Sequence, residues 1–193
     1  DRDVHIPDGL TQIRKPCTEE DLKAVFGKVI PFLPSAGPQP KKVLIEMVTA
    51  LSKVALRVLE GLGVSEVEQG KPFVLNGNEV LEGEVASFKI DHVAVMGAVG
   101  VCFEPGLIAV VKDRNFVQPE GEERVTETGE YVVSVTNLFV SELKQALDNV
   151  GIELGAAPAT LGSEGYDGGP RVVLPFVTAA GKLSLLPAIK VKG

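Results

Sequence analysis

The sequence predicts an α+β fold: an antiparallel sheet with two N-terminal helices, one later helix and a strand-rich C-terminal part. Three observations support this prediction. Apolar residues recur every three or four positions in two stretches before residue 62 and in one after residue 137, which is the period of a helix. Between residues 64 and 117 they alternate instead, as in half-buried strands. The chain also contains 21 Gly and 13 Pro, which favours many turns between short strands.

The N-terminal region is predicted to be an extended arm followed by a helix. Residues 1–17 have no helical period and are interrupted by Pro7, Gly9 and Pro16. The first helix is predicted over residues 18–30, because Thr18 is a good N-cap and acidic residues follow it in the first turn. Its apolar stripe consists of Leu22, Val25, Phe26, Val29 and Ile30. Pro31 ends this helix and opens a proline-rich connector.

A second helix is predicted to begin at Pro40 or Lys41 and to end at Gly61 or Gly63. Its apolar face is unusually wide, and comprises Val43, Leu44, Met47, Val48, Leu51, Val54, Ala55, Val58 and Leu59. So wide a face is typical of a central helix, or of one buried against a partner subunit.

The remaining elements are mostly strands. Before the acidic segment 118–129, strands are predicted at residues 71–75, 84–90, 93–103 and 107–112, with turns at 76–78 and 104–106. After that segment, a strand is predicted at 131–135. Asn137 is expected to cap a third helix with the apolar face Phe139, Leu143, Ala146, Leu147 and Val150, and Gly151 to end it. Two more strands are predicted at residues 171–177 and 182–191.

The domain organisation is predicted from the same pattern. Residues 1–17 form the arm, residues 18–118 an α+β domain, and residues 119–193 a C-terminal α+β region that is either a second small domain or part of the first. No sequence stretch recurs at a fixed spacing.

The sequence shows no set of residues that predicts catalysis, and we predict no cofactor and no metal site. His5, His92, Cys17 and Cys102 are too widely spaced to form a metal motif. The two cysteines are interpreted as buried free thiols. Asp91 and His92 are interpreted as a surface pair at a strand end.

Three further motifs are given structural interpretations. Residues 161–165 resemble a nucleophile elbow only superficially, because no helix pattern follows Ser163. Gly97 and Gly100 are interpreted as permitting a bulge or bend within a sheet. A group of carboxylates is interpreted as a solvated face; it comprises Glu120, Glu122, Glu123, Glu127 and Glu130.

Residues 18–117 resemble the HU-type histone-like DNA-binding family. The similarity lies in Gly70-x-x-Phe73-Val74-Leu75 leading to Ser87-Phe88-Lys89, and in Phe103-Glu104-Pro105-Gly106 followed by Val111-Lys112. The resemblance implies a DNA-binding dimer, and a helix over residues 107–111 where the β-branched residues favour a strand. The stretch joining Ile90 to Phe103 has no Arg, Lys or Pro, so intercalation between base pairs does not carry over.

The leading functional prediction is a non-enzymatic structural or assembly protein of the virion, appendage or scaffold type. It would act through self-association, as a homo-oligomer, or through neighbouring protein subunits. The arm and the broad apolar helix faces favour this prediction, and no segment is apolar enough to predict membrane insertion.

Two alternatives remain open. The first is an HU-like DNA-binding dimer that requires a basic patch of Arg14, Lys15, Lys41, Lys42, Lys53 and Arg57, although the net charge of −7 does not favour nucleic acid. The second is an enzyme with a site near Asp91 and His92, together with a loop that carries Ser163, Glu164, Tyr166 and Asp167.

Overall fold

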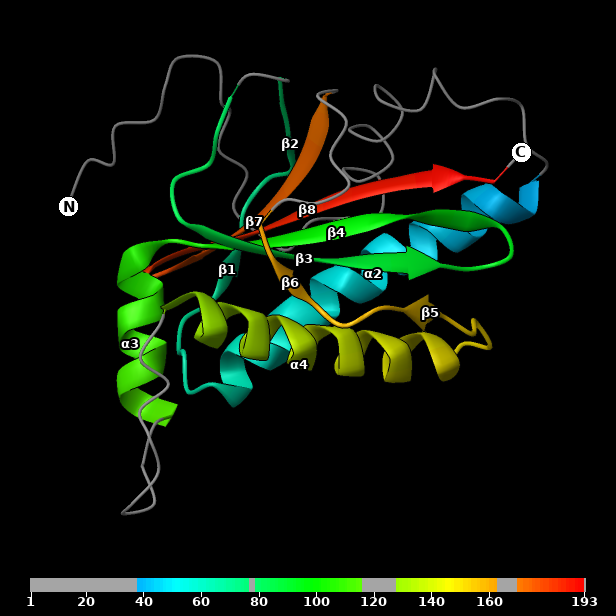
Figure 1. Cartoon of the computed structure of the whole chain (residues 1–193). Coiled ribbons are helices and arrows are strands. Elements are labelled where there is room, and N and C mark those ends of the chain that lie inside the picture. Colours follow the sequence, from blue (N-terminus) through cyan, green and yellow to red (C-terminus); the bar gives the residue numbers. More distant parts are fainter. Residues whose placement is uncertain (1–37, 77–78, 116–127, 163–169, 193) are drawn as a thin grey trace.

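The computed structural model describes residues 38–76, 79–115, 128–162 and 170–192, and one antiparallel sheet runs through all four ranges (Figure 1). Its long strands are β3 (Glu84–Asp91), β4 (Val95–Phe103), β7 (Arg171–Thr178) and β8 (Gly181–Val191). Four short strands extend it: β1 (Glu68–Gln69), β2 (Phe73–Leu75), β5 (Gly155–Ala156) and β6 (Thr160–Leu161). The strand order is β1-β7-β8-β4-β3-β5, with β2 also paired to β7 and β6 to β3.

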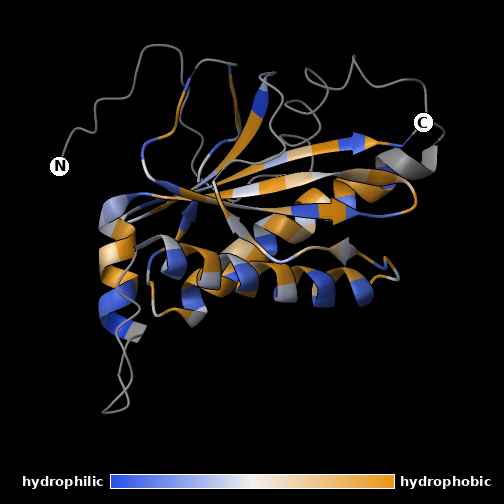
Figure 2. Ribbon diagram, in the orientation of Figure 1, coloured by the Kyte–Doolittle hydropathy of each residue, from blue (hydrophilic) through white to orange (hydrophobic). Residues whose placement is uncertain are grey.

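Three described helices lie on one side of this sheet or at its end (Figure 1). They are α2 (Pro38–Gly61), α3 (Pro105–Asn115) and α4 (Thr128–Asp148). In Figure 1 α2 and α4 run side by side in opposite directions across the sheet, and α3 stands at one end. Their apolar faces, orange in Figure 2, pack onto the sheet and form one core with it. Its largest fully buried side chains include Phe88, Phe103, Phe139, Phe176, Met47, Leu51 and Leu143.

The described residues contain an internal structural repeat, although no sequence stretch recurs at a fixed spacing. The order helix, two short strands, two long strands occurs first as α2-β1-β2-β3-β4 and again as α4-β5-β6-β7-β8. The short strands of each half pair with a long strand of the other half: β1 and β2 with β7, and β5 and β6 with β3. The two halves are therefore interleaved in one sheet.

The ends of α2 and α4 show how closely the two halves correspond. Gly63 and Gly151, 88 positions apart, both adopt left-handed backbone conformations, with φ of 78° and 75°. The next amide in each half donates to a carbonyl five residues back, Val64 to Leu59 and Ile152 to Leu147, both at 2.9 Å. These are the hydrogen bonds that close a helix when glycine follows it. The repeat lies in burial and backbone geometry, with little residue identity between the halves to reveal it.

The predicted strand at 107–112 is wrong, because these residues belong to α3. Pro105 and Gly106, predicted as a turn, are the first residues of this helix. Proline is tolerated there because the backbone N–H that it lacks would have no partner within the helix. Leu107, Ile108 and Val111 are all buried, and their spacing places them on one helical face. Packing against the core outweighs the strand preference of the β-branched side chains.

The start of the later helix was also predicted wrongly. Residues 131–135 are part of α4, which begins at Thr128, so Asn137 lies in the middle of the helix and caps nothing. The buried residues Tyr131, Val132, Val135, Thr136 and Phe139 follow the helical period.

Other predictions agree with the structure. The mixed fold with a large antiparallel sheet is confirmed, as are α2 and its end near Gly61, the four long strands and the left-handed turn at Gly151. The sequence did not predict the two-residue strands β1, β5 and β6. The arm at 1–17 and the helix at 18–30 lie outside the described residues. In the part of the chain that the structure describes, no helix is long and apolar enough to span a membrane.

Candidate functional site

The outer face of α4 is the most distinctive surface of the described chain. Ser134, Leu138 and Ser141 are exposed on it, and Asn137 is half-buried between them. The segment that joins β5 to β6 lies beside this helix and exposes Ala157 and Pro158. We call these six residues the α4 surface.

Hydrogen bonds hold α4 to the neighbouring β5–β6 segment. The side-chain oxygen of Asn137 accepts a hydrogen bond from the backbone amide of Ala159 at 2.9 Å. Further along the helix, Lys144 donates to the carbonyl oxygen of Ala156 at 3.3 Å. Because the Asn137 oxygen is engaged in this way, its NH₂ group is the end of the amide that can donate to another molecule.

The α4 surface is uncharged in a protein whose net charge is −7. Residues 131–141 contain no Asp, Glu, Lys, Arg or His, and the nearest charged residues of the helix are Glu130 and Glu142. Both exposed serines donate back to the helix, Ser134 to the carbonyl of Glu130 at 2.9 Å and Ser141 to that of Asn137 at 3.1 Å. The surface therefore offers hydroxyl and amide groups, together with the 49% exposed Leu138, but no general base.

The corresponding face of α2 differs. The 88-residue offset relates Ser134 to Glu46 and Asn137 to Thr49, both half-buried. Further along α2, Lys53, Arg57 and Glu60 are exposed. Nη1 of Arg57 lies 2.9 Å from Oε2 of Glu142 on α4, in an ion pair between the two halves.

The predicted basic patch is therefore only partly described. Lys42, Lys53 and Arg57 are exposed along α2, and Lys41 belongs to the same helix, whereas Arg14 and Lys15 lie outside the described residues. Since Arg57 is paired with Glu142, its charge is partly neutralised.

Asp91 and His92 do not form a catalytic pair. Asp91, the exposed last residue of β3, forms an ion pair with Lys192. His92 lies in the turn between β3 and β4, where its Nδ1 accepts a hydrogen bond from the amide of Ala94 at 3.1 Å and its own amide donates to Val95. These contacts support the interpretation of a surface pair at a strand end.

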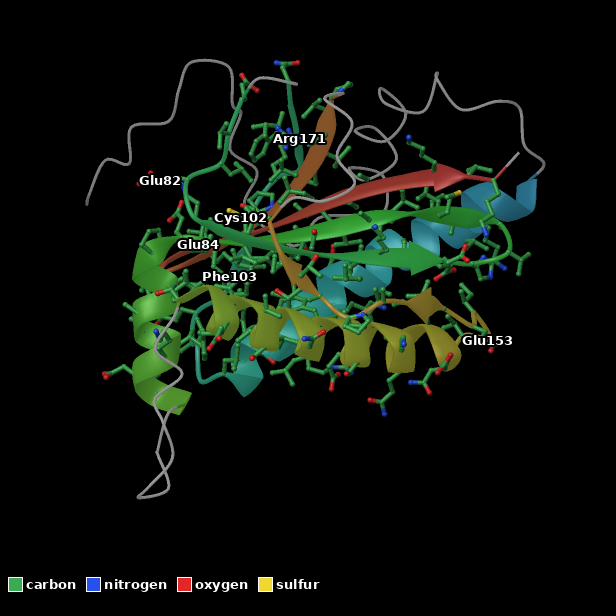
Figure 3. All side chains as sticks on the ribbon, viewed as in Figure 1. Glu82, Glu84, Cys102, Phe103, Glu153 and Arg171 are labelled. Atoms are coloured by element: carbon green, nitrogen blue, oxygen red, sulfur yellow. The ribbon has the colours of Figure 1, made fainter. Side chains whose placement is uncertain are left out.

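Cys102 is a buried free thiol, as the sequence analysis predicted, and is 2% exposed on the sheet face opposite the helices. Figure 3 shows it near Glu82 and Glu84, and its sulfur lies 3.7 Å from the carbonyl oxygen of Glu82. Burial, reinforced by the charges of Glu104 and Glu84, raises the pKa of the Cys102 thiol to about 11. The thiol is therefore protonated and unreactive near neutral pH.

Several other candidates lie outside the described residues: Cys17, the loop with Ser163, Glu164, Tyr166 and Asp167, and four members of the acidic cluster. The fifth member of the acidic cluster, Glu130, is exposed in the first turn of α4. The residues with assigned positions include no group of three or more His, Cys, Asp or Glu side chains that suits a metal ion. Gly97 allows β4 and β8 to approach closely, since a Cβ there would lie 2.1 Å from the carbonyl oxygen of Ala188.

No protein-family model matches this chain, and no curated protein matches it. Solved structures do. A CheC-like superfamily protein from Shewanella sp. PV-4 matches with a TM-score of 0.61 at 20% identity, covering 77% of this chain and 98% of that one. The chemotaxis protein CheX from Vibrio vulnificus matches with a TM-score of 0.60 at 19% identity, covering 76% and 99%. The chain has the CheX and CheC-like fold.

A third similar structure is a complex. CheX from Borrelia burgdorferi, solved with CheY, BeF₃ and Mg²⁺, matches with a TM-score of 0.52 at 16% identity, covering 78% of this chain and 97% of that one.

These findings correct two predictions. The resemblance to HU-type proteins is wrong, because the fold is that of the CheX and CheC-like proteins. The predicted structural or assembly role, with its virion, appendage and scaffold examples, is wrong for the same reason, as is the DNA-binding dimer. The alternative of an enzyme near Asp91 and His92 gains no support, since Asp91 pairs with Lys192 and His92 accepts a hydrogen bond from Ala94.

Proposed function

We propose that this chain is a chemotaxis-type signalling protein that binds a phosphorylated CheY-like protein through the α4 surface. The observation that carries the proposal is the likeness to CheX in a complex with CheY, BeF₃ and Mg²⁺. Beryllium fluoride with Mg²⁺ imitates a phosphoryl group with its metal, so the partner in that complex resembles a phosphorylated protein. The expected partner of this chain is therefore a protein that carries a phosphoryl group.

The chemistry of the α4 surface supports this assignment. A phosphoryl group is strongly negative, and a carboxylate facing it would repel it. Residues 131–141 bring no carboxylate to the helix face. The NH₂ group of Asn137 can donate to a phosphoryl oxygen, while its contact with Ala159 fixes the side chain in place.

Removal of the phosphoryl group is a second candidate activity, and Asn137 is the observation that favours it. A side-chain amide can orient the attacking water in phosphoryl hydrolysis. For this reason the earlier prediction that the chain is not an enzyme is not retained. Binding stays the first proposal, because the α4 surface has no histidine or carboxylate to act as a base.

The test is a calorimetric titration of the full chain with a purified CheY protein, with and without beryllium fluoride and Mg²⁺. We expect binding in their presence and at least about tenfold weaker binding in their absence, which corresponds to about 1.4 kcal/mol. Asn137→Ala is expected to weaken the first titration by about tenfold or more, because it removes both the donor and the contact with Ala159.

Thr49→Ala is the matched control, since Thr49 occupies the repeat-equivalent position on α2 and is also half-buried. It should bind like the unmodified chain. Equal affinity for both states of CheY, or equal losses for the two variants, would remove the α4 surface from the proposal. Phosphate release from acetyl-phosphate-treated CheY, measured in parallel, decides whether binding leads to hydrolysis.

A further inference from the structure

The sheet face opposite α2 and α4 is more buried than its described neighbours explain. Ala86, Phe88 and Ile90 belong to the helix-side core, so Ser87, between them on β3, points to the other side. Ser87 is paired with Gly100 on β4, and Gly100 with Leu186 on β8. Ser87 and Ala98 are only 1% and 2% exposed, yet no described helix lies on this side.

Described residues account for only one end of this face. Leu75, Phe73 and Leu81 pack on Cys102 and Leu186 there. The middle of the face is made of small residues, namely Ser87, Ala98, Gly100 and Ala188. Within it the buried hydroxyl of Ser87 has no hydrogen-bond partner.

The chain itself offers a segment of matching chemistry. Residues 18–30 carry a stripe of five apolar side chains at helical spacing, and a helix can approach a sheet closely where its residues are small. The first turn of that segment holds Glu19, Glu20 and Asp21. At the end of the face near the β3–β4 turn, Lys89 and Lys190 are exposed and opposite in charge to these carboxylates.

The connection is long enough. Residues 31–37 separate the segment from α2, and seven extended residues reach about 25 Å, whereas packed layers lie about 10 Å apart. In Figure 1 the start of α2 lies near the end of β8, so the segment that precedes α2 reaches the sheet where its central strands end. We propose that residues 18–30 of this chain dock as an amphipathic helix on the sheet face formed by Ser87, Ala98, Gly100 and Ala188.

The docking is tested by thiol labelling of the full-length chain. Ser87→Cys is introduced in a Cys17→Ser background, and labelling at position 87 and at Cys102 is followed separately by peptide mass spectrometry. Ser87→Cys is expected to label slowly, and at least about tenfold faster when Phe26→Asp and Val29→Asp are added, because the stripe then cannot stay buried. Ala24→Asp, on the opposite side of the same predicted helix, should leave labelling slow.

Native Cys102 reports whether the fold survives, since it is covered by Leu75 and its neighbours. The proposal is overturned by fast labelling at position 87 with an intact segment. Slow labelling in both the intact and the Phe26→Asp, Val29→Asp chains would overturn it too, since another element would then cover the face. Protection that disappears on dilution would assign the face to a second copy and equally overturn it.

A second measurement avoids substitutions altogether. Carbodiimide joins carboxylates to amines that touch, so the unmodified chain should yield intramolecular cross-links between Lys89 or Lys190 and residues 19–21. If the Phe26→Asp, Val29→Asp substitutions unfold the protein, fast labelling of Cys102 will reveal it. The cross-linking result on the unmodified chain then decides whether residues 18–30 dock on the sheet. Absence of these cross-links, when Lys192 joins to its ion-pair partner Asp91 in the same sample, would contradict the docking.

Discussion

The two halves of the repeat share one scaffold but differ in their outer surfaces. α2 and α4 cover the same side of the sheet and end in the same left-handed glycine turn. The 88-residue offset relates residues 131–141 of α4 to residues 43–53 of α2. The α2 stretch carries the half-buried Glu46 and the exposed Lys53, whereas residues 131–141 carry no charge at all. The buried positions satisfy a common packing requirement, so the outer positions are where the halves are free to differ in function.

The largest effect is expected from the cores of the two halves. Leu51 and Phe139 are related by the 88-residue offset and are both fully buried. Leu51→Ala should lower the free energy of unfolding by about 2–5 kcal/mol and Phe139→Ala by about 3–5 kcal/mol, since each leaves a cavity. Urea denaturation measures both. Exposed Ser141→Ala, the control, should stay within about 0.5 kcal/mol. A large loss for one core residue and none for the other would show that the halves contribute unequally.

The glycine turns give a finer comparison. Gly63→Ala and Gly151→Ala should each cost about 1–2 kcal/mol, because a side chain disfavours left-handed backbone and neither site has a hard clash. The nearest atom to a new Cβ at Gly63 is Cδ of Arg114 at 3.7 Å, and nothing lies within 4 Å at Gly151.

Gly61→Ala is the control for the glycine turns, because Gly61 is the last residue of α2 and also has open space around it. It should be neutral or stabilising by about 0.5–1 kcal/mol, since alanine loses less backbone entropy than glycine in a helix. Thermal unfolding of the three variants measures the change in stability at each position. Equal losses of stability at all three would contradict the explanation from backbone conformation.

The fold was predictable from the sequence where period and punctuation agreed. The wide apolar face of α2 and the alternation in β3, β4, β7 and β8 are local signals, and they were interpreted correctly. The errors at α3 and at the start of α4 arose where β-branched residues suggested strands. In both, the spacing of buried residues such as Leu107, Ile108 and Val111 was already helical. Spacing was the better guide because it records which side faces the core.

The candidate site was less predictable. The local pattern around Asn137 suggests a helix cap. Its contact with Ala159 spans 22 positions, so no local pattern predicts it. The repeat escaped detection for a related reason, since its halves share buried positions such as Leu51 and Phe139 more than identical residues. An uncharged stretch at 131–141 in an acidic chain was the one available signal.

The two halves should also differ in their response to alkaline pH. Burial raises the pKa of Tyr131 on α4 to about 12, from an ordinary value of 10.0, while Val43 holds the equivalent position on α2. Between pH 10 and 12 the unfolded chain loses the phenol proton that the folded chain keeps, so stability falls as pH rises through that window. Below pH 10 the contribution is complete.

Tyr131→Phe removes the titrating phenol and with it this pH dependence of stability. Relative to its own value at pH 7, the stability of this variant should decline less steeply above pH 10 than that of the unmodified chain, as followed by thermal unfolding at several pH values. Cys102, with its pKa of about 11, adds a similar decline from pH 9 in both proteins and so cancels in the comparison. Parallel curves for the two proteins would contradict the role of Tyr131.

The smallest effect is expected where the halves meet at the surface. Arg57 and Glu142 pair at 2.9 Å, but their side chains are 58% and 34% exposed, so water and salt screen the attraction. A double-mutant cycle with Arg57→Ala and Glu142→Ala should give a coupling of about 0.2–1 kcal/mol that shrinks in high salt. A larger, salt-independent coupling would mean that the halves are joined by this pair. The expected small one leaves the shared apolar core as the main connection, and leaves the outer face of α4 free to serve a partner.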